Sequence, residues 1–168
     1  MPKPRGPATH IGYHGYVNIE LLSWPTLAVS LLALAITSCC VLLHYETLSW
    51  LHRRLPKMHG PRQQRVLRLI FAILALHSAE IFLFALGYLA LLQDPRYGSL
   101  EGISSVGLVD CGYFSAVVFT TLGLGDIVPH GPIRILVGPQ SLVGFVLITW
   151  SASFTFIEMQ RYWNDRHA

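Results

Sequence analysis

Three long apolar runs constrain this chain more than any other feature of its sequence. Residues 21–45 and 135–157 contain no Lys, Arg, Asp or Glu, and residues 69–93 contain one such residue, Glu80. As helices, runs of 23 to 25 residues would be roughly 35 to 37 Å long, enough to cross a hydrocarbon core of about 30 Å. Because backbone groups inside lipid must pair within their own segment, we predict a transmembrane helix over each run.

The low charge of the chain argues against most classes of soluble protein. Charged residues make up 12% of the 168 residues, about half of the roughly 25% found in soluble domains, and hydrophobic residues make up 52%. Three cysteines do not form a disulfide framework, and two of them, Cys39 and Cys40, lie inside the first apolar run. We therefore expect an integral membrane protein, and neither a cytosolic enzyme nor a nucleic-acid-binding protein.

The first run has an alternative interpretation as a cleaved leader. It is longer than the apolar region of a signal peptide and lacks a small-residue cleavage site at its end. Residues 36–39, Ile-Thr-Ser-Cys, resemble a bacterial lipoprotein cleavage box, but the apolar run continues past the cysteine. We interpret residues 21–45 as a helix that stays in the membrane.

The segment between the first two runs predicts the orientation of the helices. Residues 52–68 carry six Lys or Arg side chains and no acidic residue. Because loops rich in Lys and Arg stay in the cytoplasm, we expect residues 46–68 to form a cytoplasmic loop. The N-terminal segment, residues 1–20, would then lie outside, and residues 158–168 would form a cytoplasmic tail. This rule accounts for the basic loop without nucleic-acid binding.

A fourth apolar stretch, residues 111–125, is too short to span the membrane. Its 15 residues would rise roughly 22 Å as a helix, and it ends in Gly-Leu-Gly, which disfavours a helix. We predict a short helix over residues 111–119, capped by Asp110, whose C-terminal end points into the membrane and stabilises a cation there. The chain would then turn back, which is tolerated only where protein or water surrounds the backbone.

The turn that follows this helix is suited to binding cations through its backbone. Glycine alternates with other residues over 121–125, and glycine adopts positive φ without a steric penalty. Such alternation lets consecutive carbonyl groups face the same way. A row of carbonyls can replace the water shell of an ion, so we predict an ion-binding site here.

These residues resemble a known signature. Residues 120–126, Thr-Thr-Leu-Gly-Leu-Gly-Asp, are similar to the selectivity filter of potassium channels, Thr-x-Gly-aromatic-Gly-Asp. Residues 69–157 also resemble the two-helix pore module of that superfamily in the order of their elements: outer helix 69–93, pore helix 111–119, filter 121–125 and inner helix 135–157. The additional helix at 21–45 is similar to that of small bacterial ion-channel-domain proteins, which implies the bacterial inner (plasma) membrane.

The resemblance implies an all-α membrane protein with three transmembrane helices, a re-entrant pore helix and a filter loop. It would assemble as a homotetrameric pore in the lipid bilayer and conduct monovalent cations, with K⁺ as the permeant ion. The filter would be formed by five residues, the first four of which would bind K⁺ through backbone carbonyls: Thr121, Leu122, Gly123, Leu124 and Gly125. Asp126 would lie at the outer mouth, and Gly144 matches the position of a hinge glycine. Such a channel is not an enzyme and needs no organic cofactor.

Two filter positions depart from the family pattern. Leu122 and Leu124 stand where the family has valine and tyrosine. Leucine fills less space than tyrosine and cannot donate a hydrogen bond, although the backbone carbonyls are retained. A weakly selective cation channel is therefore an alternative prediction, and a structural or regulatory subunit with a vestigial pore is another.

His77 and Glu80 are polar residues near the middle of the second run, three apart and so on one helix face. An ionised carboxylate at this depth is costly and indicates a partner or a function. One interpretation is a hydrogen-bonded pair buried against the first helix or the pore helix, and another is a role in gating by pH. A third is a membrane metal-binding protein or enzyme centred on this pair. For a metal, the other apolar runs offer only Cys39, Cys40 and His44, and we expect His44 at the inner end of its helix.

Gly138 and Pro139 interrupt the third run near its outer end. Proline removes one backbone hydrogen bond and usually bends a helix. We expect this pair in the first turn of the inner helix, with a gating kink as the alternative.

Overall fold

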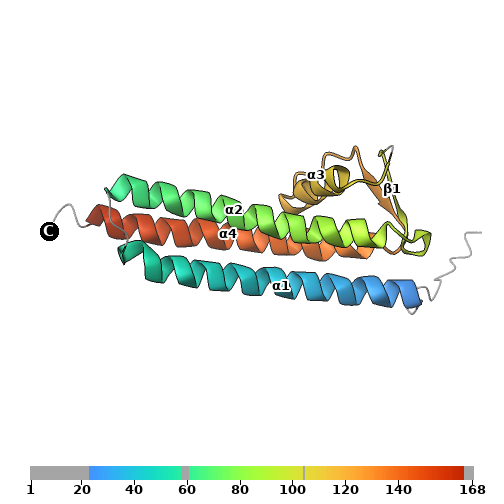
Figure 1. The fold of residues 1–168 in the computed structure, drawn as a ribbon, viewed down its shortest axis with the longest axis horizontal. Coiled ribbons are helices and arrows are strands. Elements are labelled where there is room, and N and C mark those ends of the chain that lie inside the picture. The colour runs from blue at the N-terminus through green and yellow to red at the C-terminus, as the bar shows by residue number, and fades with distance from the viewer. Residues whose placement is uncertain (1–22, 58–60, 104, 165–168) are drawn as a thin grey trace, which may run out of the picture.

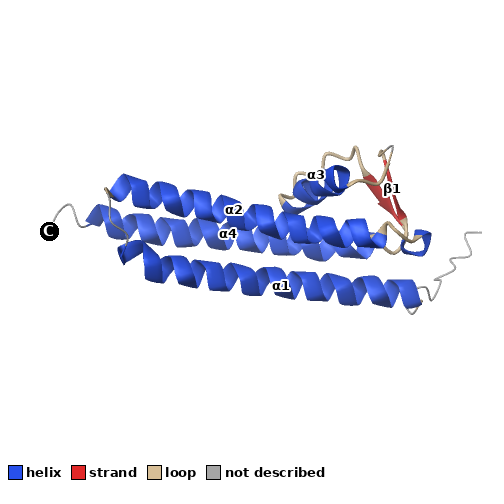
Figure 2. Ribbon diagram, in the orientation of Figure 1, coloured by secondary structure: helices blue, strands red, loops and turns tan. Residues whose placement is uncertain are grey.

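The computed structural model describes residues 23–57, 61–103 and 105–164, which are mainly helical (Figure 1). Three long helices run side by side: α1 (Trp24–Arg54), α2 (Arg62–Leu91) and α4 (Arg134–Asn164). A shorter helix, α3 (Leu108–Phe119), packs against α2 and α4 at one end of this bundle. Short elements complete the described part (Figure 2): the 3₁₀ helices η2 (Leu55–Lys57) and η3 (Pro95–Tyr97), and the strands β1 (Ser99–Glu101) and β2 (Val128–His130).

Each of the three long helices is long and apolar enough to cross a membrane. The candidate spans are Trp24–Lys57, Gln63–Leu91 and Arg134–Arg161. Large apolar side chains such as Leu31 and Phe71 are exposed on the bundle surface, where lipid takes the place of water. The chain is therefore an integral membrane protein with three transmembrane helices, as the apolar runs predict.

The helices are longer than the apolar runs from which we predicted them. α1 continues to Arg54 instead of ending at residue 45, and α2 begins at Arg62 instead of residue 69. The prediction that residues 46–68 form a loop is therefore wrong, because only residues 55–61 separate the two helices. The reason is that low polarity marks the part of a helix inside lipid, while its hydrogen bonds continue through the hydrated interface.

The other predicted boundaries also shift. α2 ends at Leu91 instead of residue 93, and α4 continues to Asn164, past the predicted start of the tail at residue 158. Residues 1–20, the first two residues of the first predicted helix and residues 165–168 of the tail lie outside the described residues.

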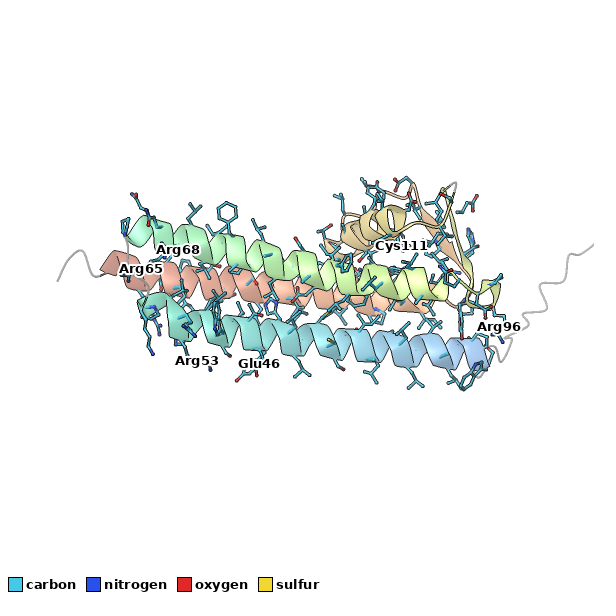
Figure 3. All side chains as sticks on the ribbon, in the orientation of Figure 1. Glu46, Arg53, Arg65, Arg68, Arg96 and Cys111 are labelled. Carbon is cyan, nitrogen blue, oxygen red and sulfur yellow. The ribbon has the colours of Figure 1, made fainter. Side chains whose placement is uncertain are left out.

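Basic side chains mark one end of the bundle. The last turn of α1 holds His52, Arg53 and Arg54, which is favourable at the negative end of the helix dipole. Figure 3 shows Arg53 of α1 at the same end of the bundle as Arg65 and Arg68 of α2, and Arg96 at the opposite end. The start of α1 lies at the same end as the segment between α2 and α4, so the up-and-down arrangement agrees with the predicted topology (Figure 1).

The two strands connect the ends of the re-entrant segment. β1 precedes α3, β2 follows residues 121–125, and they pair antiparallel with Ser99 opposite His130 and Glu101 opposite Val128. The side chains of His130 and Glu101 strengthen the pairing, with Nε2 and Oε2 2.8 Å apart. The segment therefore enters and leaves at one end of the bundle, as predicted, although the sequence did not indicate these strands.

Candidate functional site

The pore helix α3 begins earlier than the sequence predicts. It starts at Leu108 after Gly107, whose extended backbone (φ −134°, ψ 159°) occupies the N-cap position. The prediction that Asp110 is the N-cap is wrong: this residue lies in the first helical turn. A carboxylate in the first turn still interacts favourably with the positive end of the helix dipole.

A buried polar network fixes α3 to both neighbouring helices. The Tyr88 hydroxyl of α2 donates to Gln140 Oε1 of α4 at 2.6 Å. Gln140 Nε2 donates to the backbone carbonyl and the hydroxyl of Ser115 in α3, at 3.0 and 2.6 Å. The Ser115 hydroxyl in turn donates to the carbonyl of Ile81 at 2.7 Å. Since each of these buried groups has a partner, the network sets the orientation of α3 without an unsatisfied polar atom.

The sequence predicts only part of this network. Tyr88 and Gln140 both lie within apolar runs, and a polar side chain inside such a run is a signal that a partner is needed. The identity of that partner depends on how helices that are far apart in sequence pack together.

Gly144 lies where α4 touches the end of the pore helix. A Cβ atom at this position would overlap the backbone carbonyl of Phe119, the last residue of α3. This close approach gives a packing reason for the glycine, and α4 is one continuous helix through it. The predicted role of Gly144 as a gating hinge stays a prediction. Pro139 lies inside α4, one turn further along than the first turn in which we expected it.

The backbone of the filter segment alternates in conformation. Thr121, Gly123 and Gly125 have positive φ values of 58°, 57° and 79°. The positive φ expected at Gly123 is therefore observed, and it is one of three at alternate positions. For Thr121, a β-branched residue, this conformation is strained, so the surrounding structure must hold it in place.

The hydrogen bonds of this segment define the direction of its carbonyl groups. The amides of Thr121 and Leu122 donate to the carbonyls of Val118 and Val117 at 3.0 Å, and the amide of Gly123 donates to Val117 at 3.4 Å. In a trans peptide, the N–H and the preceding C=O point in opposite directions. The carbonyls of residues 120, 121 and 122 therefore point away from the last turn of α3, as a row on one side of the segment.

The C-terminal end of the predicted filter segment is tied to α3 by a side chain that we did not anticipate. The Tyr113 hydroxyl in α3 donates to Asp126 Oδ2 at 2.6 Å, while Asp126 Oδ1 accepts from the amide of Ile127 at 3.1 Å. Leu122 and Leu124 leave 62% and 58% of their surface exposed, so neither is buried against its own pore helix. A hydroxyl from α3 thus anchors the segment, although Leu124 has no hydroxyl of its own.

Two spanning helices, a re-entrant helix between them and a carbonyl row at its end have the plan of a pore. A family model described as ion channel matches residues 70–161, more than half of the 168 residues. The chain belongs to this ion channel family. The match covers most of α2, the re-entrant segment and most of α4, which is the two-helix, potassium-channel-like pore module that the sequence resembles. Neither the search of curated proteins nor the search of solved structures finds a match.

The helix α1 lies outside the matched region of this ion channel chain, yet it contributes to a polar cluster in the bundle. The predicted pair is present: His77 Nδ1 lies 2.9 Å from Glu80 Oε2. His44 of α1 joins it, with Nδ1 2.9 Å from Glu80 Oε1, and His44 and Glu80 are fully buried. On its other side, His44 Nε2 lies 3.3 Å from the hydroxyl of Ser151 in α4.

The expected position of His44 at the inner end of its helix is wrong. Because α1 continues to Arg54, His44 lies roughly three turns before its end and faces the other helices. The pair packs against the first helix through Glu80 and His44 and against α3 through His77 and Phe119, so it contacts both of the helices that the sequence suggested. We name His44, His77 and Glu80 the His–Glu cluster.

Proposed function

We propose that four copies of this chain form a potassium-conducting channel whose filter is residues 121–125. The observation that carries the proposal is the row of filter carbonyls that turn away from α3, with positive φ at every second residue. Carbonyl oxygens arranged in this way can replace the hydration shell of K⁺. The carbonyls of Thr121 and Leu122 belong to this row. The resemblance adds those of Gly123 and Leu124 as further ligands, and Asp126 would concentrate cations at the outer mouth.

Assembly into a homotetramer follows from the same geometry. One row of carbonyls lies on one side of an ion and cannot surround it, so several copies must meet around an axis. Rotation about that axis closes the ring. The exposed side chains of Leu122 and Leu124 support this arrangement, because neighbouring subunits would cover apolar surface that is costly to leave in water.

The orientation that we propose places the basic end of the bundle in the cytoplasm. Arg53, Arg54 and Lys57 follow the apolar part of α1, and Arg65 and Arg68 precede that of α2. By the positive-inside rule, the start of α1 and the filter would then lie outside. From the resemblance we expect the membrane to be the plasma membrane of a bacterium. Conduction is passive flow along the electrochemical gradient, so the chain would act without enzymatic chemistry and without an organic cofactor.

Recording from the purified protein in a planar bilayer tests the proposal. Under opposing K⁺ and Na⁺ gradients, we expect a reversal potential close to the K⁺ equilibrium potential. A reversal potential near zero under bi-ionic conditions would instead support a weakly selective cation channel, the alternative left open by Leu124. The absence of current from protein that elutes as a tetramer would support a subunit without a conducting pore.

A further inference from the structure

The His–Glu cluster brings three potential metal ligands together inside the membrane. His44, His77 and Glu80 each offer a ligand atom, and these atoms lie within 4.8 Å of one another. His44 and Glu80 are fully buried, and only 14% of the His77 side chain is exposed. The ligands come from two helices, α1 and α2, so anything bound between them would link the additional helix to the pore module.

We propose that the His–Glu cluster is a binding site for a divalent transition-metal ion of the zinc class. Two imidazoles and one carboxylate are the ligands of one type of zinc site, which leaves a fourth position open. At Zn–N and Zn–O distances near 2.1 Å, tetrahedral ligands are roughly 3.4 Å apart. The Nδ1–Oε distances of 2.9 Å at both histidines are shorter than this spacing, and the three ligand atoms lie within 4.8 Å of one another, so the side chains would rotate to admit an ion.

The surroundings of His44 suit a metal-bound imidazole. Coordination through Nδ1 requires the ring hydrogen to be on Nε2, and Nε2 faces the Ser151 hydroxyl at 3.3 Å. That hydroxyl can accept the hydrogen bond. Metal-bound histidines almost always donate their second N–H to an oxygen acceptor, which is usually a carboxylate, a backbone carbonyl or a water molecule. Trp150 packs beside the same ring, with centroids 5.3 Å apart, and restricts its rotation.

The charge of the cluster also favours a cation. The ion-pair partners of Glu80 within the described part of the chain are the two histidines, which are neutral when they bind a metal. The described side chains beside the cluster carry no fixed charge: Cys40 lies one turn from His44 on α1, Ser151 and Trp150 belong to α4, and Phe119 belongs to α3. A divalent ion would compensate a carboxylate that is costly to keep ionised at this depth.

The location of the cluster connects it to the filter. The ring of His77 lies 5.9 Å from the ring of Phe119, which ends α3 directly before the filter threonines. An ion at the cluster would therefore hold α1 and α2 together beside Phe119, which precedes the filter segment in the chain. We expect metal occupancy to stabilise the bundle and to change the current.

Metal binding can be measured directly on the tag-free, full-length protein in detergent after its metals have been removed. Titration with Co²⁺ should produce the visible ligand-field bands of a site with nitrogen and oxygen ligands, and Zn²⁺ should abolish them. In calorimetry, the substitutions His44→Ala and Glu80→Gln should each weaken Zn²⁺ binding by more than about tenfold, and Ser151→Ala by about tenfold. Size-exclusion elution and circular dichroism report whether each variant is folded.

His52→Ala is the matched control. His52 lies on the same helix and also contacts a carboxylate, Glu158 Oε1 at 2.8 Å. The second partner of that carboxylate is Arg161, at 3.3 Å, which cannot act as a metal ligand. The substitution His52→Ala should leave the Co²⁺ bands and the Zn²⁺ affinity unchanged.

The metal-site proposal is overturned if the wild type gives no Co²⁺ bands, or if His52→Ala weakens Zn²⁺ binding as much as His44→Ala does. If His44→Ala does not fold, Glu80→Gln decides alone, since it keeps the shape of the side chain. Because binding is measured without ion flux, failure of the channel proposal would not affect this result.

Discussion

The filter segment and the His–Glu cluster lie close together but depend on different parts of the chain. The proposed filter would bind ions through backbone carbonyls of consecutive residues, so leucine at 122 and 124 would keep these ligands, while a substitution of glycine would not. The cluster uses side chains from separate helices, so it depends on residue identity and on helix packing. We therefore expect ion binding by the filter segment to be sensitive to backbone conformation, and ion binding by the His–Glu cluster to be sensitive to single side-chain atoms.

We expect the largest loss of K⁺ flux from a substitution of Gly123, which tests whether the filter segment depends on backbone conformation. The substitution Gly123→Ala adds a Cβ to a residue with φ of 57°, a conformation that L side chains rarely adopt. We expect K⁺ efflux from liposomes to fall to background while the assembled oligomer persists in detergent. The control is Gly112→Ala in helix α3, where no neighbouring atom lies within 4 Å of the added Cβ. Undiminished flux in Gly123→Ala would remove the filter from residues 121–125.

The next largest effect is expected where α4 supports the filter. Gly144→Ala would place a methyl group against the Phe119 carbonyl, so α3 or α4 must move. Overpacking of this kind typically costs about 1 to 3 kcal/mol of stability, and we expect a lower thermal unfolding temperature and reduced K⁺ flux. Gly138→Ala, on the same helix with open space around it, should change neither measurement. Equal stability of the two variants would show that the close approach is not maintained in the membrane.

A smaller effect is expected at the outer end of the filter. Tyr113→Phe removes the hydroxyl that donates to Asp126 and leaves the ring in place. We expect the K⁺/Na⁺ permeability ratio, measured from bi-ionic reversal potentials, to fall by less than about tenfold, because one hydrogen bond is lost and the backbone ligands remain. An unchanged ratio would mean that the carbonyl row holds its geometry without this anchor.

The smallest effect is expected at Glu80 in metal-free protein. Glu80→Gln preserves shape, and one histidine can change tautomer to accept from the new amide, so both hydrogen bonds survive. We expect currents of wild type and variant to coincide from about pH 5.5 to 8.5, with normal assembly. A displaced midpoint in the variant would indicate that the carboxylate senses protons and would contradict a purely structural role in the metal-free state.

Several elements of the pore module could be predicted from local sequence. The three spanning helices follow from apolar runs because insertion into lipid depends on composition over about 20 residues. The re-entrant segment follows from a run too short to cross, and the positive φ at Gly123 from the spacing of glycines. The ends of the helices did not follow, because a helix in the interface is polar and looks like a loop.

The sequence by itself therefore determined the membrane class, the order of the elements and the segment whose backbone turns carbonyls to one side. Each of these depends on neighbouring residues. The tertiary structure alone decided that Gln140 holds α3, that Tyr113 anchors Asp126 and that His44 joins Glu80. These contacts depend on the rotation and axial position of helices that are separated by many residues. A pattern of polarity along the chain does not specify those two quantities, because side chains on one face of a helix can meet several alternative partners.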